Sequence, residues 1–254
     1  MNRTAFASPK GVCQNCGAKL AENMRFCSVC GQDHRHRRLR VDELARDLLS
    51  DLWTLDGPWF RTLRALVPEA GSLSKQYVNG HRVGHVNPVR FHLIILVVEV
   101  ALLGLFSGIF EFNLPGYVEW EALLLLVIFV PLISWLLRVT CGPTYSLAEV
   151  MVLTLYMLGM TSLTCVLLLG MFGLLAWILH NIQQPWLWNA GVLVIAGIGY
   201  VLLPGYLMLS LVRFFGCRWG RAFVVVAGFP LLGLAVGAGF KWINALFGWA
   251  LAGK

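Results

Sequence analysis

The sequence predicts an all-α polytopic membrane protein with a small zinc-ribbon head near its N-terminus. Three features carry this prediction: two cysteine pairs at metal-ligand spacing, long apolar runs from Val89 onward, and positive charge concentrated ahead of those runs. The composition agrees, because 58% of the residues are hydrophobic and only 13% are charged. A soluble domain would carry roughly a quarter charged residues.

The composition changes along the chain and predicts three regions. Residues 1–34 form the zinc ribbon, built on a short β-hairpin. Residues 35–88 form a cytoplasmic amphipathic linker that ends in a juxtamembrane element. Residues 89–254 form a transmembrane helical bundle.

The cysteine pairs give the most specific signal in the chain. Cys13 and Cys16 form one CxxC motif, Cys27 and Cys30 form a second, and ten residues separate the pairs. Four thiolates at this spacing close a tetrahedral Zn²⁺ site, so we expect a structural Zn²⁺ as cofactor. A closed site has no open position for a substrate, which makes it a poor candidate for catalysis. Thioredoxin-like redox chemistry would need a βαβ context that neither pair has.

Each CxxC motif is followed by a glycine, Gly17 or Gly31. A glycine at this point tolerates the positive φ that such a turn requires. We therefore expect both glycines to adopt a left-handed conformation.

Two amphipathic helices are predicted in the linker, in "LRVDELARDLLSDLW" and "DGPWFRTLRALVP". In the second, Pro58 falls in the first turn and Pro68 lies past the end. The apolar faces of these two helices fit two arrangements. The helices pack on each other and cap the bundle, or the basic second helix lies in the membrane interface.

The juxtamembrane element, "SLSKQYVNGHRVGHVNPVRFHL", spans residues 72–93. Its positive charges and imidazoles suit a phosphate headgroup or another anionic ligand. They equally suit the basic anchor that flanks an inward-facing helix end. The candidate anion-binding residues are Lys75, His81, Arg82, His85 and Arg90.

Five transmembrane spans are predicted, at about 91–110, 121–137, 146–179, 187–212 and 222–240. The span at 146–179 is long for one crossing, which leaves open whether it makes one pass or two. Residues 1–90 hold fourteen Lys and Arg against eight Asp and Glu. Basic loops alternate with acidic or uncharged ones, so we expect the N-terminus in the cytoplasm and the C-terminus in the periplasm.

Two carboxylates in the predicted spans, Glu99 and Glu149, are candidate functional groups. Glu99 lies nine residues past Arg90, about 13 Å along a helix and close to the middle of the bilayer. A carboxylate there indicates a functional site, or a protonated acid bonded to a neighbouring helix. Glu149 lies at the start of the 146–179 span and favours a structural role.

Paired glycines, Gly104 with Gly108 and Gly233 with Gly237, suit close helix packing. The packing lies within one bundle, or between two copies of the chain in a homo-oligomer.

The segments "CQNCG…FCSVCGQ" and "RTLRALVPEAGSLSKQYVNGHRVGHVNPVRFHL" resemble an uncharacterised family of bacterial multi-span membrane proteins. Members carry a zinc-ribbon head and a Tyr-x2-Gly-x-Arg element with a proline beyond it. Here that element is Tyr77, Gly80, Arg82 and Pro88, and the resemblance covers about residues 13–110. It implies this architecture in the bacterial cytoplasmic (inner) membrane, and it brings no known activity.

Three functions follow as hypotheses. In the first, the ribbon and the basic linker recruit a cytoplasmic protein partner or anionic lipid headgroups to the bilayer, without catalysis. The second is transport of a lipid or small molecule through the bundle, with Glu99 as its polar centre. The third is an enzyme acting on a lipid phosphate, but no catalytic motif supports it, and we lean against an enzyme. Acidic residues within the linker argue against nucleic acid as a partner.

Overall fold

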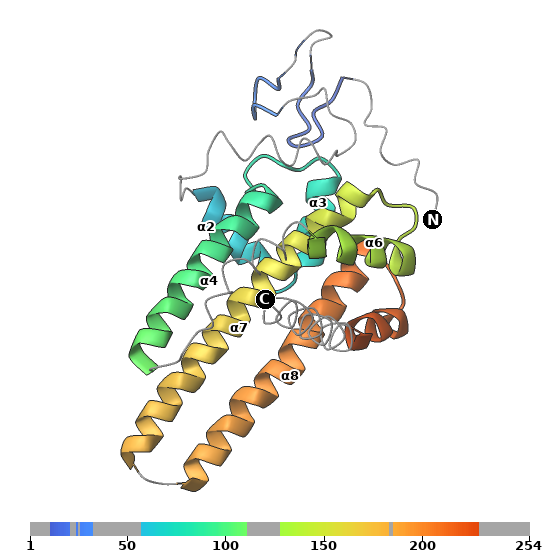
Figure 1. Cartoon of the computed structure of the whole chain (residues 1–254). Helices are drawn as coiled ribbons and strands as arrows, with labels where there is room; N and C mark the ends of the chain where they lie inside the picture. Colours follow the sequence, from blue (N-terminus) through green and yellow to red (C-terminus); the bar gives the residue numbers. More distant parts are fainter. Residues whose placement is uncertain are drawn as a thin grey trace, which may run out of the picture.

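The computed structural model describes residues 11–20, 24, 26–32, 57–110, 128–182 and 185–228. This part of the chain is mainly helical. The first amphipathic helix predicted in the linker lies outside it. The labelled helices are α2 (Gly57–Leu66), α3 (Ala70–Val78), α4 (Pro88–Phe110), α6 (Val130–Cys141), α7 (Leu147–Ile182) and α8 (Pro185–Phe215), and a short helix, Trp219–Gly228, follows them (Figure 1).

The long helices α4, α7 and α8 run side by side in Figure 1, and the ribbon lies above their upper ends. Contacts along α4 and α7 fix their relative direction. Phe91, near the start of α4, faces Tyr156, with ring centroids 5.5 Å apart. Phe106, near the end of α4, lies against Gly170, further along α7. The two helices are therefore parallel, and the chain between them returns to the end that carries the ribbon.

Helix α6 provides the last part of this return. The short connection 142–146 joins it to α7, and α6 lies across the upper part of the molecule in Figure 1. The hydroxyl of Ser134 donates a hydrogen bond of 2.9 Å to the hydroxyl of Thr154, which ties the two helices together. Each hydroxyl also lies within hydrogen-bond distance of a carbonyl of its own helix, so the single proton of Ser134 is shared between two acceptors and both buried hydroxyls have partners.

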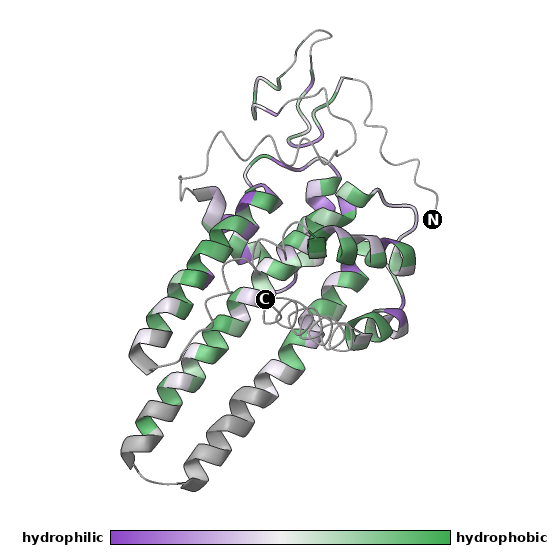
Figure 2. Ribbon diagram, viewed as in Figure 1, coloured by the Kyte–Doolittle hydropathy of each residue, from purple (hydrophilic) through white to green (hydrophobic). Residues whose placement is uncertain are grey.

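Within the described residues, two helical segments are long and apolar enough to cross a membrane, judged by length and composition: Pro88–Phe106 and Leu147–Leu175. Figure 2 shows apolar residues along α4 and α7, with hydrophilic residues near the ribbon. Both segments fall in predicted spans. The long span at 146–179 lies in α7, one continuous helix of 36 residues.

The other predicted spans are described less completely. The span at 187–212 lies within α8, whereas the spans at 121–137 and 222–240 are described only over 128–137 and 222–228. Five crossings therefore stay a prediction.

Helix α3 docks closely on α8. The backbone N–H of Ala70 donates to the Ser210 hydroxyl at 3.0 Å, and the Tyr206 hydroxyl donates to the carbonyl of Leu66 at 3.0 Å. A Cβ atom at Gly71 would lie 2.2 Å from the carbonyl oxygen of Ser210. Glycine at position 71 therefore permits this approach of the two backbones.

Replacing Gly71 with alanine should push α3 away from α8, because a backbone atom cannot swing aside as a flexible side chain would. We expect Gly71→Ala to lower the free energy of unfolding by about 1–3 kcal/mol. The matched control is Gly108→Ala on α4, where a Cβ atom would meet nothing within 4 Å. Thermal unfolding in detergent, followed by tryptophan fluorescence, compares the two. Equal melting temperatures would contradict the contact.

Candidate functional site

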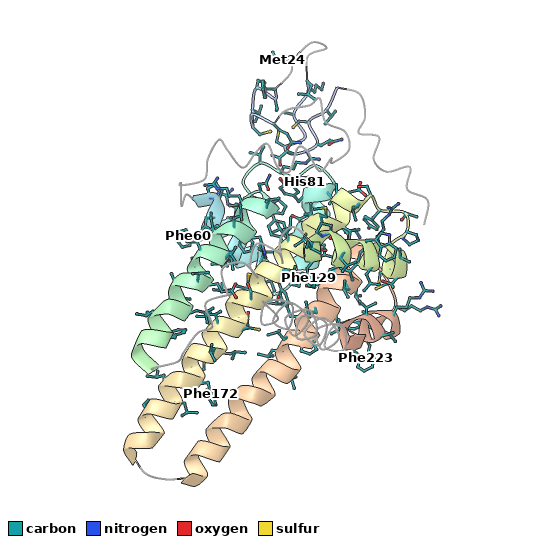
Figure 3. All side chains as sticks on the ribbon, viewed as in Figure 1. Met24, Phe60, His81, Phe129, Phe172 and Phe223 are labelled. Atoms are coloured by element: carbon teal, nitrogen blue, oxygen red, sulfur yellow. The ribbon has the colours of Figure 1, made fainter. Side chains whose placement is uncertain are left out.

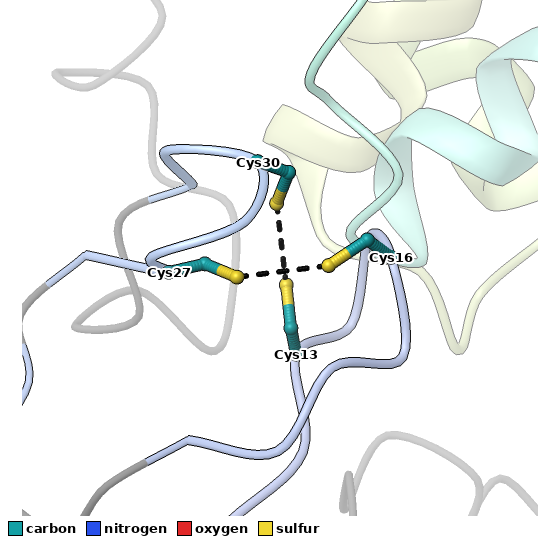
Figure 4. Close-up of side chains that lie close together, drawn as sticks. All are labelled: Cys13, Cys16, Cys27 and Cys30. Atoms are coloured by element: carbon teal, nitrogen blue, oxygen red, sulfur yellow. Dashed lines mark hydrogen bonds between the residues drawn. The ribbon is translucent and has the colours of Figure 1, made fainter.

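Two turns of the same geometry present the four cysteines of the ribbon (Figure 4). The N–H of Gly17 donates to the carbonyl of Cys13 at 2.9 Å, and the N–H of Gly31 donates to the carbonyl of Cys27 at 2.8 Å. Both glycines have φ of 74°, which confirms the predicted left-handed conformation. In the ribbon, Val12 and Lys19 form an antiparallel β-bridge, and Phe26 is also in a bridge.

The four sulfur atoms of Cys13, Cys16, Cys27 and Cys30 lie within 4.8 Å of one another and converge in Figure 4. The Sγ atoms of Cys13 and Cys30 are 3.5 Å apart, and those of Cys16 and Cys27 are 3.6 Å apart. Zinc–sulfur bonds of 2.3 Å in a tetrahedron give sulfur–sulfur distances of about 3.8 Å. The donor set therefore fits one Zn²⁺, and the cofactor prediction is confirmed at the level of ligand identity and spacing.

The acidities of the thiols differ across the site. Backbone N–H groups of Cys30 and Val29 donate to the sulfur of Cys27 and lower its pKa to about 6. Ala18 donates to Cys16 in the same way and lowers its pKa, but burial and the three neighbouring thiols outweigh this and raise that pKa to about 12. These pKa values differ only while the site holds no metal. A divalent cation would bind all four groups as thiolates.

The ribbon touches the loop between α3 and α4. A Cβ atom at Gly80 would lie 2.5 Å from the side-chain oxygen of Gln14, so Gln14 lies directly against the backbone of the loop. Gln14 stands inside the first CxxC motif, next to zinc ligand Cys13. Gly80 has φ of 103°, which only glycine adopts readily. The metal centre is therefore seated on the juxtamembrane element.

Two hydrogen bonds from the helices fix the same loop at Val86. The backbone N–H of Val86 donates to the Thr62 hydroxyl of α2 at 2.9 Å. The Tyr156 hydroxyl of α7 donates to the carbonyl of Val86 at 2.5 Å. All three residues are buried. Two helices distant in sequence thus hold the loop at one residue.

A basic cluster lies on this loop and on α2, made of Arg61, His81 and His85. The Nη1 atom of Arg61 packs against Gly84, where a Cβ atom would come within 2.7 Å. Burial lowers the pKa of His85, and the positive charges of Arg61 and His81 lower it further. Figure 3 shows His81 between the ribbon and the ends of the helices.

The structure brings together only part of the predicted anion-binding set. The groups that act electrostatically on His85 are His81, which was predicted, and Arg61, which was not. Arg82 instead turns to Tyr77, with its guanidinium carbon 5.8 Å from the ring centroid. Lys75 lies exposed on α3, and Arg90 lies in the first turn of α4. The sequence contained a signal for Arg61, because it falls on the basic face predicted for α2.

The two carboxylates predicted within the spans differ in role. Glu149 is buried and caps α7: its carboxylate accepts from the N–H of Ser146 at 2.7 Å, while its own N–H donates to the Ser146 hydroxyl at 3.3 Å. This reciprocal capping box accounts for Glu149 structurally. Glu99 lies half-buried on α4 and shares a hydrogen bond with Ser162 of α7.

Two models of known protein families match the chain, one over the ribbon and one over the helices that follow it. Residues 12–33 match the sequence model of a zinc-ribbon domain. Residues 56–99, from the start of α2 into α4, match that of a protein family of unknown function, DUF3667. The resemblance predicted from the sequence is confirmed, because the chain is similar to an uncharacterised family and carries an N-terminal zinc ribbon. No curated protein and no solved structure matches the chain.

The zinc centre gives a direct test. The purified protein should carry one Zn²⁺ per chain, and Cys13→Ser should lose it, because three thiolates hold zinc more weakly than four. The matched control is Cys165→Ser, which removes an exposed thiol on α7 far from the ribbon in sequence. Native mass spectrometry measures the metal content. Full zinc occupancy in Cys13→Ser would contradict the assignment of the ligands.

Proposed function

We propose that this chain is a multi-pass membrane protein with a non-catalytic recognition head on its cytoplasmic face. The head consists of the zinc ribbon and the basic juxtamembrane element, and it recruits an anionic ligand to the membrane surface. The observation that carries the proposal is the contact of Gln14 with Gly80, which joins the ribbon to the loop that begins α4. The head and the apolar helices therefore form one unit.

The directions of the helices support several crossings. Because α4 and α7 are parallel, a chain that crosses the bilayer in both must cross back between them. Helix α6 lies in that interval and contacts α7 near the end that carries the ribbon (Figure 1). Helix α8 then returns to the side of the ribbon, so even the described residues fit a bundle of alternating spans.

The distribution of charge supports a cytoplasmic head. Arg90 begins α4, Arg138 lies in the last turn of α6, and Arg213 lies in the last turn of α8. All three helix ends lie on the side that carries the ribbon. Basic residues at helix ends on one side favour the cytoplasmic side.

The zinc site supports a binding role over a catalytic one. All four ligand positions are protein thiolates, so the metal offers no place for water or substrate. What the site provides is a fixed shape: zinc holds two turns together in a segment too small to form a hydrophobic core. A structural site of this kind presents a surface, and here that surface adjoins the basic cluster.

Transport through the bundle is the second candidate, and the contact between Glu99 and Ser162 favours it. A carboxyl group between two apolar helices is unfavourable in hydrocarbon unless it is paired or has a function. In this candidate Glu99 is essential and the ribbon is accessory. In the proposed function the dependence is reversed.

Two variants separate these candidates. Glu99→Gln keeps the size of the side chain and removes its charge, so the proposed head should keep both its zinc and its bound ligand. Cys13→Ser should lose both. The measurement is native mass spectrometry of the full chain, with zinc and co-purifying ligand counted per protein.

The outcomes are distinguishable within one data set. Ligand retained by Glu99→Gln and lost from Cys13→Ser supports the recognition head. Ligand lost from a folded, zinc-containing Glu99→Gln protein and retained by Cys13→Ser would overturn it in favour of transport. Glu99→Asp is the matched control, since it retains the carboxyl group.

A further inference from the structure

We infer that Arg61, His81 and His85 form a binding site for a phosphate group, carried by a lipid headgroup or free in solution. The inference rests on the proposed function for its position at the membrane surface, and it names the ligand of that head. Arg61 comes from α2, while His81 and His85 come from the loop between α3 and α4. The site therefore exists only in the folded chain.

Arg61 is held in place by the shape of the loop. Its Nη1 atom lies so close to Gly84 that a Cβ atom there would come within 2.7 Å. Gly84 has φ of 91°, so the loop at this residue also favours glycine. A guanidinium group with one edge packed on backbone still has donors on its other edge, and paired donors suit phosphate oxygens.

Positive charge in the cluster has no counter-charge among the described residues. These residues contain three carboxylates. Glu69 caps α3 by accepting from the N–H of Ser72, and Glu149 caps α7. Glu99 lies further along α4, within a segment apolar enough to span a membrane. None of them forms a described ion pair with the cluster, so the positive charge of these three side chains is not offset within the described part of the chain and would attract an anion.

His85 provides a second, independent observation. Its Nδ1 atom is buried and has no hydrogen-bond partner within the described part of the chain. A buried polar atom without a partner is destabilising by about 1–3 kcal/mol, and such atoms often mark a ligand position. Arg61 and His81 place positive charge near this imidazole. A negatively charged partner that forms a hydrogen bond with the Nδ1 atom would both satisfy that atom and offset the positive charge.

The surroundings of Arg61 suit a lipid. Phe60, its neighbour on α2, is 66% exposed, and Figure 3 shows it at the outer edge of the helices beside α4. An exposed aromatic ring next to an arginine matches the boundary between acyl chains and headgroups. Inorganic phosphate would use the same cations but would leave Phe60 without a role.

The test is a binding titration of the full-length protein in detergent with three probes. Short-chain phosphatidylglycerol carries a net negative phosphodiester, short-chain phosphatidylcholine is the zwitterionic comparison, and inorganic phosphate is the soluble source. We expect Arg61→Gln to weaken phosphatidylglycerol binding about tenfold or more, because a charged hydrogen bond is lost. The matched control is Arg64→Gln, an exposed arginine one turn further along α2, which should change binding by less than about twofold.

Each outcome bears on the inference. Binding of phosphatidylglycerol alone, sensitive to Arg61→Gln, supports a headgroup site. Equally sensitive binding of inorganic phosphate alone supports the phosphate site and rules out a lipid headgroup as its ligand. No binding by any probe, or equal losses in Arg61→Gln and Arg64→Gln, overturns the inference. Zinc content confirms that each variant is folded, and Arg61 is exposed, so its loss should not unfold the protein.

The site should also bind more tightly at lower pH. Burial and the charges of Arg61 and His81 lower the pKa of His85, so the free site holds this imidazole largely neutral near neutrality. A bound anion favours the protonated form, so binding takes up a proton and strengthens as pH falls. We expect phosphatidylglycerol to bind several-fold more tightly at about pH 6 than at about pH 8. The charge of its phosphodiester is constant over this range.

His85→Gln isolates the contribution of this imidazole to the pH dependence. The ratio of affinities between the two pH values should shrink in the variant, because the group that takes up the proton is gone. An unchanged ratio would mean that the proton binds elsewhere, and it would remove His85 from the site.

Discussion

Val86 is the residue on which the described structure depends most. Its N–H is bonded to Thr62 of α2 and its carbonyl to Tyr156 of α7, so a short loop is fixed by two helices at once. Aromatic packing surrounds this point: Phe91 lies 5.1 Å from Trp59 and 5.5 Å from Tyr156, between ring centroids. Buried hydrogen bonds in an apolar setting are costly to break, so the loop has a defined position.

In the proposed recognition head, the fixed loop between α3 and α4 supports both the ribbon and the basic cluster. The loop contacts Gln14 of the ribbon at Gly80, and it contacts the guanidinium of Arg61 at Gly84. The metal centre therefore does not touch the basic cluster directly but shares its support. Through this shared loop, we expect zinc binding to the ribbon to affect the surface next to His81 and His85.

The sequence predicted what depends on spacing along the chain. The cysteine pairs gave the zinc ligands, the glycines after them gave the turn conformation, and apolar length gave α4 and α7. It did not predict what depends on contacts between distant segments. Arg61 lies more than twenty residues before His85, and only the fold brings them together. Arg82 stands three residues from His85 in sequence but lies over the ring of Tyr77. Glu149 is a local case: the sequence favoured a structural role, and the capping bonds with Ser146, three residues away, supply its physical reason.

The central claim is that the zinc ribbon is seated on the loop that begins α4, and amide hydrogen exchange tests it most directly. Exchange at residues 79–87 would be compared in the zinc-loaded protein and after removal of zinc by chelation. We expect faster exchange around Gly80 once the ribbon loses its metal, while the amide of Val86 stays protected by Thr62. Unchanged exchange around Gly80 would show that the ribbon does not rest on the loop, and it would contradict the recognition head as a single unit.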